Sequence, residues 1–170
     1  MKLRHINNLP EVDVEERLGN IYEDTPWIVR SGLQWRPFVD IAEFHRVLCD
    51  LVLALSDEEQ LSLIRAHPDL IGRAALSGQL GTNSAAEQRE AGLDVDALSL
   101  DDQVAFTSLN TSYRDRFGFP FVVCVREHRK RTILAAFEQR LKHDRQEEVR
   151  TAIGEINKIA GYRLLDVIEN

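Results

Sequence analysis

The sequence lacks several signals that mark the common classes of binding site. It has only two cysteines in 170 residues, Cys49 and Cys124, which lie far apart in apolar surroundings. This spacing supports neither a disulfide nor a cysteine-ligated metal site, so two buried, reduced thiols are the simplest interpretation. The chain also has no His-Glu-x-x-His motif, no glycine-rich phosphate loop and no Gly-x-Ser-x-Gly motif. We therefore expect no metal and no nucleotide cofactor.

Long apolar runs and an excess of basic charge are also missing. No stretch of about 18 consecutive apolar residues occurs, so we expect no transmembrane helix. Residues 1–8 lack the apolar core of a signal peptide and the sequence does not end in Ser-Lys-Leu, so we expect a cytoplasmic protein. The net charge of −7 argues against nucleic-acid binding, which requires a basic face to neutralise phosphates. We expect neither a membrane nor a nucleic acid as partner.

Helical periodicity is abundant in this sequence. An apolar stripe predicts a helix from about Asp40 to Leu55, and Ser56–Glu59 has the capping-box pattern that begins the next helix. That second helix must end near Ala66, because the residue before Pro68 is disfavoured in the α conformation. Thr25 followed by Pro26 predicts the start of another short helix.

The same reasoning extends to the rest of the chain and gives a fold class. Proline and the short length of Phe119–Val125 make a sheet improbable there, and no convincing strand pair occurs elsewhere. With about eight helices in all, we predict an all-α bundle forming a single domain over residues 1–170. Further helices are expected at Leu70–Gly81, Ser84–Ala91, Thr132–His143 and Arg145–Ile168, and in a segment capped by Ser99 and ended by Gly118.

His67 is the histidine best placed for chemistry. Pro68 constrains its backbone, and it follows the end of a predicted helix. An ordinary pKa near 6.5 suits an imidazole to proton transfer at neutral pH. A histidine at a helix end is nevertheless more often structural than catalytic, and the other four histidines lie in polar or marginal positions.

A second polar cluster spans Ser84 to Gln88. Ser84 and Glu87 have the spacing of a capping box, which is a purely structural interpretation. Gln88 adds an amide that carries a donor and an acceptor together, and such a group can pair with the edge of a urea or imide. Neither pattern is specific by itself.

Arg163 is conspicuous because it falls on an apolar helix stripe, three residues after Ala160 and four before Val167. A guanidinium on such a face requires a partner. The partner could be a carboxylate in the core, the end of a neighbouring helix, an anionic ligand or Glu87.

Taken together, these motifs resemble a known family. His67–Leu70, then Ser84–Gln88, then Phe117–Val122, with Arg163–Leu164 in the last helix, are similar in order and spacing to 2-oxo-4-hydroxy-4-carboxy-5-ureidoimidazoline (OHCU) decarboxylases. The resemblance covers nearly the whole chain. It implies an all-α, homodimeric, cofactor-free carboxy-lyase that converts OHCU to (S)-allantoin in urate catabolism.

The resemblance also implies roles for individual residues. His67 would be the catalytic proton donor, and Glu87 the second catalytic group. Arg163 is a further candidate for contact with the substrate. The remaining residues expected to line the substrate pocket are Pro68, Ser84, Ala85, Ala86, Gln88, Phe119, Pro120, Phe121, Val122 and Val123.

Two other functions fit the residues without the resemblance. One is a cofactor-free hydrolase of a cyclic ureide that uses His67 and Glu87, which product analysis would separate from a decarboxylase. The other is a helical adaptor without chemistry, which predicts a dry core around His67 and an exposed apolar patch elsewhere.

Overall fold

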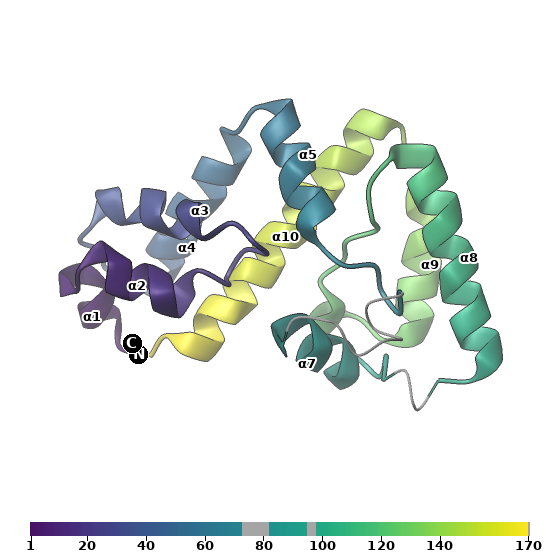
Figure 1. Ribbon diagram of the computed structural model, residues 1–170, viewed down its shortest axis with the longest axis horizontal. Coiled ribbons are helices and arrows are strands. Elements are labelled where there is room, and N and C mark those ends of the chain that lie inside the picture. Colours follow the sequence, from purple (N-terminus) through teal and green to yellow (C-terminus); the bar gives the residue numbers. More distant parts are fainter. Residues whose placement is uncertain (73–81, 95–97, 170) are drawn as a thin grey trace. The chain divides into compact units, whose positions relative to one another are not determined.

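The computed structural model describes residues 1–72, 82–94 and 98–169. Within these ranges the chain forms nine α-helices and two short 3-10 helices, and its only β-type pairing is an isolated bridge between Lys2 and Glu169 (Figure 1). The prediction of an all-α fold is therefore confirmed. Every helix in the described ranges is too short or too polar to cross a bilayer.

The chain separates into two compact units. Residues 1–66 and the chain from Ile156 onward form unit 1, and residues 67–155 form unit 2. Helix α10 (Arg145–Val167) supplies residues to both. The expectation of one domain over residues 1–170 stays a prediction.

Unit 1 holds the amino-terminal helices. Helix α2 packs on α3, and α3 packs on α4. Asp40 caps α4 by accepting a hydrogen bond from the backbone N–H of Glu43 at 2.7 Å. The helices of this unit are α1 (Leu3–Asn8), α2 (Glu11–Leu18), α3 (Pro26–Gly32), the 3-10 helix η1 (Leu33–Trp35), α4 (Ile41–Leu53) and α5 (Asp57–Ala66).

The predicted boundaries in unit 1 agree with the structure. Helix α5 ends at Ala66 as expected, and Pro26 is the first residue of α3. At the start of α5 the Ser56 N–H donates to the Glu59 carboxylate at 2.9 Å, while the Glu59 N–H donates to Ser56 Oγ at 3.4 Å, so the predicted capping box is present. Helices α1 and η1 were not predicted from the sequence.

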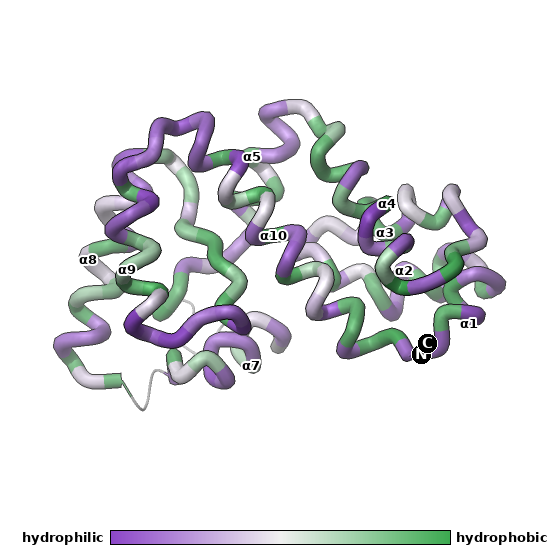
Figure 2. Tube along the Cα trace, turned by 180° about the vertical axis from the view of Figure 1, so that it is seen from behind, coloured by the Kyte–Doolittle hydropathy of each residue, from purple (hydrophilic) through white to green (hydrophobic). Residues whose placement is uncertain are grey.

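Unit 2 surrounds a cluster of aromatic side chains. Helices α8 and α9 contact each other, and hydrophobic and hydrophilic positions alternate along both (Figures 1 and 2). Tyr113 is central to the cluster, because its ring contacts four neighbouring rings edge-on or tilted. The cluster consists of Phe106, Tyr113, Phe117, Phe119, Phe121 and Phe137, all buried. The elements of this unit are α7 (Thr82–Glu90), α8 (Leu100–Phe117), the 3-10 helix η3 (Val125–Glu127), α9 (Lys130–Arg140) and the first part of α10.

Predicted helix ends in unit 2 agree in part. Ser99 caps α8 through a hydrogen bond from the Asp102 N–H, and Gly118 ends that helix with a φ of 79°, a conformation that suits glycine. Helix α9 begins two residues before and ends three residues before the predicted Thr132–His143. The helix predicted for Leu70–Gly81 falls mostly outside the described residues.

Candidate functional site

His67 begins a partly buried loop that side chains of unit 2 hold in place. Arg114 Nε donates to both carboxylate oxygens of Asp69, at 2.9 and 3.0 Å. Asn110 Nδ2 donates to the Leu70 carbonyl at 2.7 Å. The His67 side chain is buried, with 6% of its surface exposed. The loop thus has a defined backbone although it lacks regular structure.

One residue of this loop is strained. Ile71 has a φ of 50°, a left-handed conformation that a β-branched side chain rarely adopts. Its backbone N–H donates to Gln88 Oε1 at 3.1 Å in a buried environment. Such strain costs about 1–3 kcal/mol and persists only where the surroundings enforce it. Gln88 therefore helps to fix the loop that follows His67.

Helix α7 buries a polar face. Ser84, Glu87 and Gln88 are buried and share one side of the helix, whereas Ala86 is exposed. A helix of a globular protein ordinarily turns its apolar residues inward, so this arrangement is the reverse of the usual pattern. Enclosed polar groups of this kind are typical of a binding or catalytic site.

The position of Ser84 rules out one structural interpretation. Because α7 begins at Thr82, Ser84 is its third residue and not the residue that precedes it. The interpretation of Ser84 and Glu87 as a capping box was therefore wrong. Of the five consecutive residues predicted to line a pocket, the structure brings Ser84, Glu87 and Gln88 together on the buried face, and Ala85 lies only partly buried beside them.

The apolar segment Phe119–Val123 has no helix or strand, and all of its residues are buried. Charged side chains supply hydrogen bonds here: Arg140 Nη1 donates to the Val122 carbonyl at 2.7 Å, and the Cys124 N–H donates to Glu155 at 2.8 Å. The N–H groups of Phe121, Val122 and Val123 form no hydrogen bond with another described residue. Buried N–H groups nearly always have a partner, so these three suit a bound ligand or water.

Helix α7 lies against the end of this segment. It packs on η3, which begins at Val125. Burial raises the pKa of the Cys124 thiol to about 11, and the negative charges of Glu127, Glu155 and Glu87 add to that rise. The packing of α7 on η3 and the bond between Gln88 and Ile71 bring the three sequence motifs together in unit 2.

Arg163 lies in unit 1 and has protein partners there. Its guanidinium donates to Glu23 Oε1 at 2.9 Å and to the carbonyls of Asn20 and Ile21 at 3.3 and 3.4 Å. Its side chain is almost fully buried. Of the partners considered for this arginine, a carboxylate is present, although Glu23 is only partly buried, and the contact of Arg163 with a substrate stays a prediction.

Two buried charged residues in unit 2 were not predicted from the sequence. Arg140 and Glu148 form an ion pair with a shortest N–O distance of 2.5 Å, and Glu148 is fully buried. Arg140 follows Ile133 and Phe137 on the buried face of α9. The reasoning that singled out Arg163, a charge on an apolar stripe, would have found Arg140 as well.

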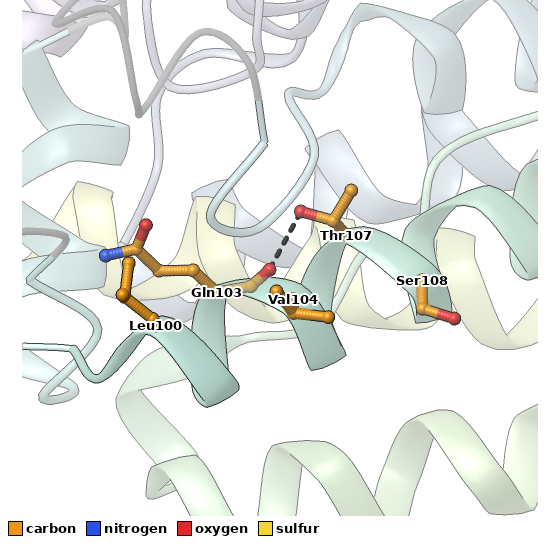
Figure 3. Close-up of a pocket in the computed structure, with 5 residues that line it drawn as sticks. All are labelled: Leu100, Gln103, Val104, Thr107 and Ser108. Atoms are coloured by element: carbon orange, nitrogen blue, oxygen red, sulfur yellow. Dashed lines mark hydrogen bonds between the residues drawn. The ribbon is translucent and has the colours of Figure 1, made fainter.

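A surface cavity lies apart from these motifs. A shallow cavity of about 390 Å³ lies on α8 and is lined by Leu100, Gln103, Val104, Thr107 and Ser108 (Figure 3). Within it Thr107 Oγ1 donates to the Gln103 carbonyl at 2.8 Å, and none of the predicted site residues takes part. In the ranges that the structure describes, no group of three or more His, Cys, Asp or Glu side chains is arranged to hold a metal ion.

Comparison with known proteins defines the class and then the family. The chain is 36% identical over 166 residues to the 2-oxo-4-hydroxy-4-carboxy-5-ureidoimidazoline decarboxylase of Haloferax volcanii, covering 98% of this chain and 95% of that protein. The decarboxylase of the same name from Mus musculus is 34% identical over 168 residues, with coverages of 99% and 93%. The class of protein is thus a carboxy-lyase with an all-α fold.

A structural match and a family model agree with this class. The crystal structure of an (S)-allantoin synthase superposes with a TM-score of 0.79 at 27% identity, covering 99% of this chain and 54% of that one. This chain therefore spans about half the length of that synthase. The family model for OHCU decarboxylase matches residues 7–165. The chain belongs to the OHCU decarboxylase family, and the resemblance seen in the sequence is confirmed.

Proposed function

We propose that this chain decarboxylates OHCU to (S)-allantoin without a cofactor, with His67 as the proton donor and Glu87 as the second catalytic group. The buried polar face of α7 is the observation that carries the proposal. It encloses a carboxylate, a hydroxyl and an amide in the same unit as the buried His67. Relatives that are named for this reaction and align along almost their full length support it.

The reaction itself makes modest demands on the protein. When the carboxylate leaves as CO2, the bonding electron pair stays on a ring carbon of the substrate. A conjugated carbonyl or imine beside that carbon can delocalise the pair, so the substrate supplies its own electron sink. The protein must hold the carboxylate, stabilise the developing charge and add one proton to one face of the neighbouring ring carbon, which carries the ureido group, while the carbon that lost CO2 becomes a carbonyl as its hydroxyl gives up a proton.

Each demand has a candidate group. His67 adds the proton, and its position after the helix, before Pro68, limits the directions from which it can do so. Glu87 and Ser84 hold the hydroxyl or ureido portion of the substrate. The N–H groups of Phe121 to Val123 donate to the enolate-like oxygen, in the manner of an oxyanion hole. A single fixed donor would produce one enantiomer of allantoin.

Other parts of the proposal concern the pocket and the assembly. Gln88 lines the pocket through its NH2 group while its Oε1 holds Ile71. Pro68, Ala85, Phe119 and Pro120 complete the proposed lining. The enzyme is expected to work as a homodimer in the cytoplasm, and sedimentation equilibrium of the purified chain would test the dimer.

A coupled assay tests the reaction. Urate is converted by urate oxidase and 5-hydroxyisourate hydrolase, with or without this protein, and circular dichroism follows optically active allantoin. We expect rapid formation of (S)-allantoin with the protein and slow racemic allantoin without it. His67→Asn and Glu87→Gln are expected to lower kcat by about 10²–10⁴-fold, the usual contribution of a positioned acid or base.

Two matched variants control for the substitutions themselves. His5→Asn changes an exposed histidine, and Glu90→Gln changes an exposed carboxylate of α7. Both are expected to keep the wild-type rate. Racemic allantoin at the uncatalysed rate with the wild-type protein would refute OHCU as substrate, and a ring-opened acid without CO2 release would identify a hydrolase instead.

A further inference from the structure

Arg140 links the core of unit 2 to the backbone of the apolar segment. It is the last residue of α9, and 6% of its surface is exposed. Its Nε and Nη2 donate to Glu148 Oε1 at 2.8 and 2.5 Å, and its Nη1 donates to the Val122 carbonyl at 2.7 Å. The guanidinium carbon also lies 4.4 Å from the centre of the Phe121 ring. Arg140 thus contacts two successive residues of the segment.

Glu148 holds the guanidinium in this orientation. Besides Arg140, its carboxylate accepts a hydrogen bond from the Tyr113 hydroxyl and lies 2.8 Å from His143 Nδ1. A carboxylate with this many partners leaves Arg140 little freedom to rotate, and a fork of N–H groups against one carboxylate fixes the plane of the guanidinium. The direction of the remaining Nη1–H bond toward Val122 follows from that plane.

The Val122 carbonyl and the Val123 N–H belong to one peptide group. In the described residues only Arg36–Pro37 is cis, so this peptide is trans, and its C=O and N–H point in opposite directions. Because Arg140 binds the C=O, the N–H of Val123 must point away from Arg140. That N–H is one of the three without a partner among the described residues.

We propose that Arg140, held by Glu148, is a positioning residue that aims the Val123 N–H at the charge that develops on the substrate during decarboxylation. The inference rests on the proposed function, which places the Phe119–Val123 backbone at the substrate. A cationic donor on the carbonyl also polarises the peptide, so the N–H on its far side becomes a stronger donor. Arg140 contacts the substrate at no point in this scheme and acts only through the peptide.

An alternative is that the pair serves stability alone, and paired substitutions separate the two roles. Removal of one member of a buried ion pair leaves an uncompensated charge, so Arg140→Met alone is expected to unfold easily. The double variant Arg140→Met with Glu148→Gln removes both charges and is expected to fold. Arg140→Lys keeps a donor for Val122 but loses the fork on Glu148. Arg150→Met with Glu147→Gln makes the same chemical changes at exposed positions of α10 and is the matched control.

Three measurements are made on every variant: kcat and KM by the allantoin assay, urea unfolding, and the ¹⁵N shift of the Val123 amide in the absence of ligand. The double variant is expected to unfold near the wild-type urea concentration, with kcat lowered ~10- to 100-fold and KM changed less than about threefold, because a misdirected oxyanion donor costs less than the ~10²–10³-fold of a deleted one. Arg140→Lys is expected to recover part of kcat, and the control pair all of it. The Val123 ¹⁵N shift is expected to move only in the Arg140 variants.

The outcomes separate this inference from the function on which it rests. A folded double variant with wild-type kcat and an unmoved Val123 shift would overturn the positioning role. The positioning role would also be overturned if kcat falls only in variants that have lost stability and is unchanged in a stable double variant. If the wild-type protein makes no (S)-allantoin, the proposed function is refuted. A changed Val123 ¹⁵N shift in the Arg140 variants would still support the control of that peptide by Arg140.

Discussion

Gln88 and Asn110 fix adjacent residues of the His67 loop, and a comparison of their leucine variants tests whether Gln88 also contacts the substrate. Gln88 Oε1 accepts from the Ile71 N–H at 3.1 Å, and Asn110 Nδ2 donates to the Leu70 carbonyl at 2.7 Å. Both side chains are buried. Leucine is similar in size to either residue but forms neither hydrogen bond.

The expected losses of stability are similar. Each variant leaves one buried backbone group without its partner, which costs about 1–3 kcal/mol. Asn110→Leu belongs at the lower end, because it also removes Oδ1, a buried atom that finds no hydrogen-bond partner among the described residues. Gln88→Leu also belongs below the upper limit, because Ile71 can then leave its left-handed conformation and release part of the strain.

The expected losses of activity differ. Both variants loosen the loop that carries His67, so both lower kcat/KM. Gln88→Leu additionally removes the proposed hydrogen bond from its NH2 group to the substrate, which is worth about 0.5–1.5 kcal/mol for neutral partners and 1.5–3 kcal/mol for charged ones. We therefore expect kcat/KM of Gln88→Leu to be ~10-fold below that of Asn110→Leu.

Urea unfolding and the allantoin assay, run on the same preparations, check this expectation. Equal losses of kcat/KM at equal losses of stability would refute the contact between Gln88 and the substrate. Gln88 would then act only on the loop. The double variant provides an internal control: the two bonds fix neighbouring residues, so its loss of stability should fall below the sum of the single losses.

Two further predictions concern stability. Burial raises the pKa of Cys49 and of Cys124 to about 11, so between the ordinary thiol pKa and pH 11 the unfolded chain releases protons that the folded chain keeps. Urea unfolding should show stability lost with rising pH from about 9 to 11, by up to ~1.4 kcal/mol per pH unit for the buried Cys124 and by less for the partly buried Cys49, which solvent screens. A flat profile would contradict the desolvation of Cys124. Gly161→Ala should destabilise by about 1–2 kcal/mol, because a Cβ there would lie 2.8 Å from His45 Cε1. Gly154→Ala, at an uncrowded position of the same helix, should instead stabilise by about 0.5–1 kcal/mol, and equal effects at the two positions would argue against the close contact with His45.

Much of the fold could be predicted because its helix boundaries are local. Asp40, Ser99 and Gly118 act within one turn of the helix ends that they define, so a short stretch of sequence contains the whole signal. Helix α1 could not be predicted in this way. It has six residues, and its ordering depends on distant contacts such as the hydrogen bond from the Leu3 N–H to the Glu169 carbonyl at 3.1 Å. Propensity alone rarely sustains so short a helix.

The parts of the candidate site that could be predicted are likewise those with a local signal in the sequence. His67 could be picked out because Pro68 follows it, which is a local constraint. The role of Ser84 could not be assigned by spacing, because a capping box and a buried helix face share the same interval and differ only in where the helix begins. Arg140 could have been found from its place on an apolar helix stripe, but its bond to Val122 could not, because it joins residues 18 positions apart.

Stability alone does not explain the buried polar face of α7. Leucines at Ser84, Glu87 and Gln88 would make α7 an ordinary amphipathic helix, with apolar side chains against the rest of unit 2. Burial of the polar side chains costs desolvation free energy that their packing contacts do not offset. A fold selected only for stability has no use for them, whereas a decarboxylase must surround a polar substrate while keeping water away from its ring carbon. The same requirement accounts for the N–H groups of Phe121–Val123, which have no partner among the described residues. Pairing in a sheet would have satisfied them, whereas an irregular segment bound by Arg140 leaves them available.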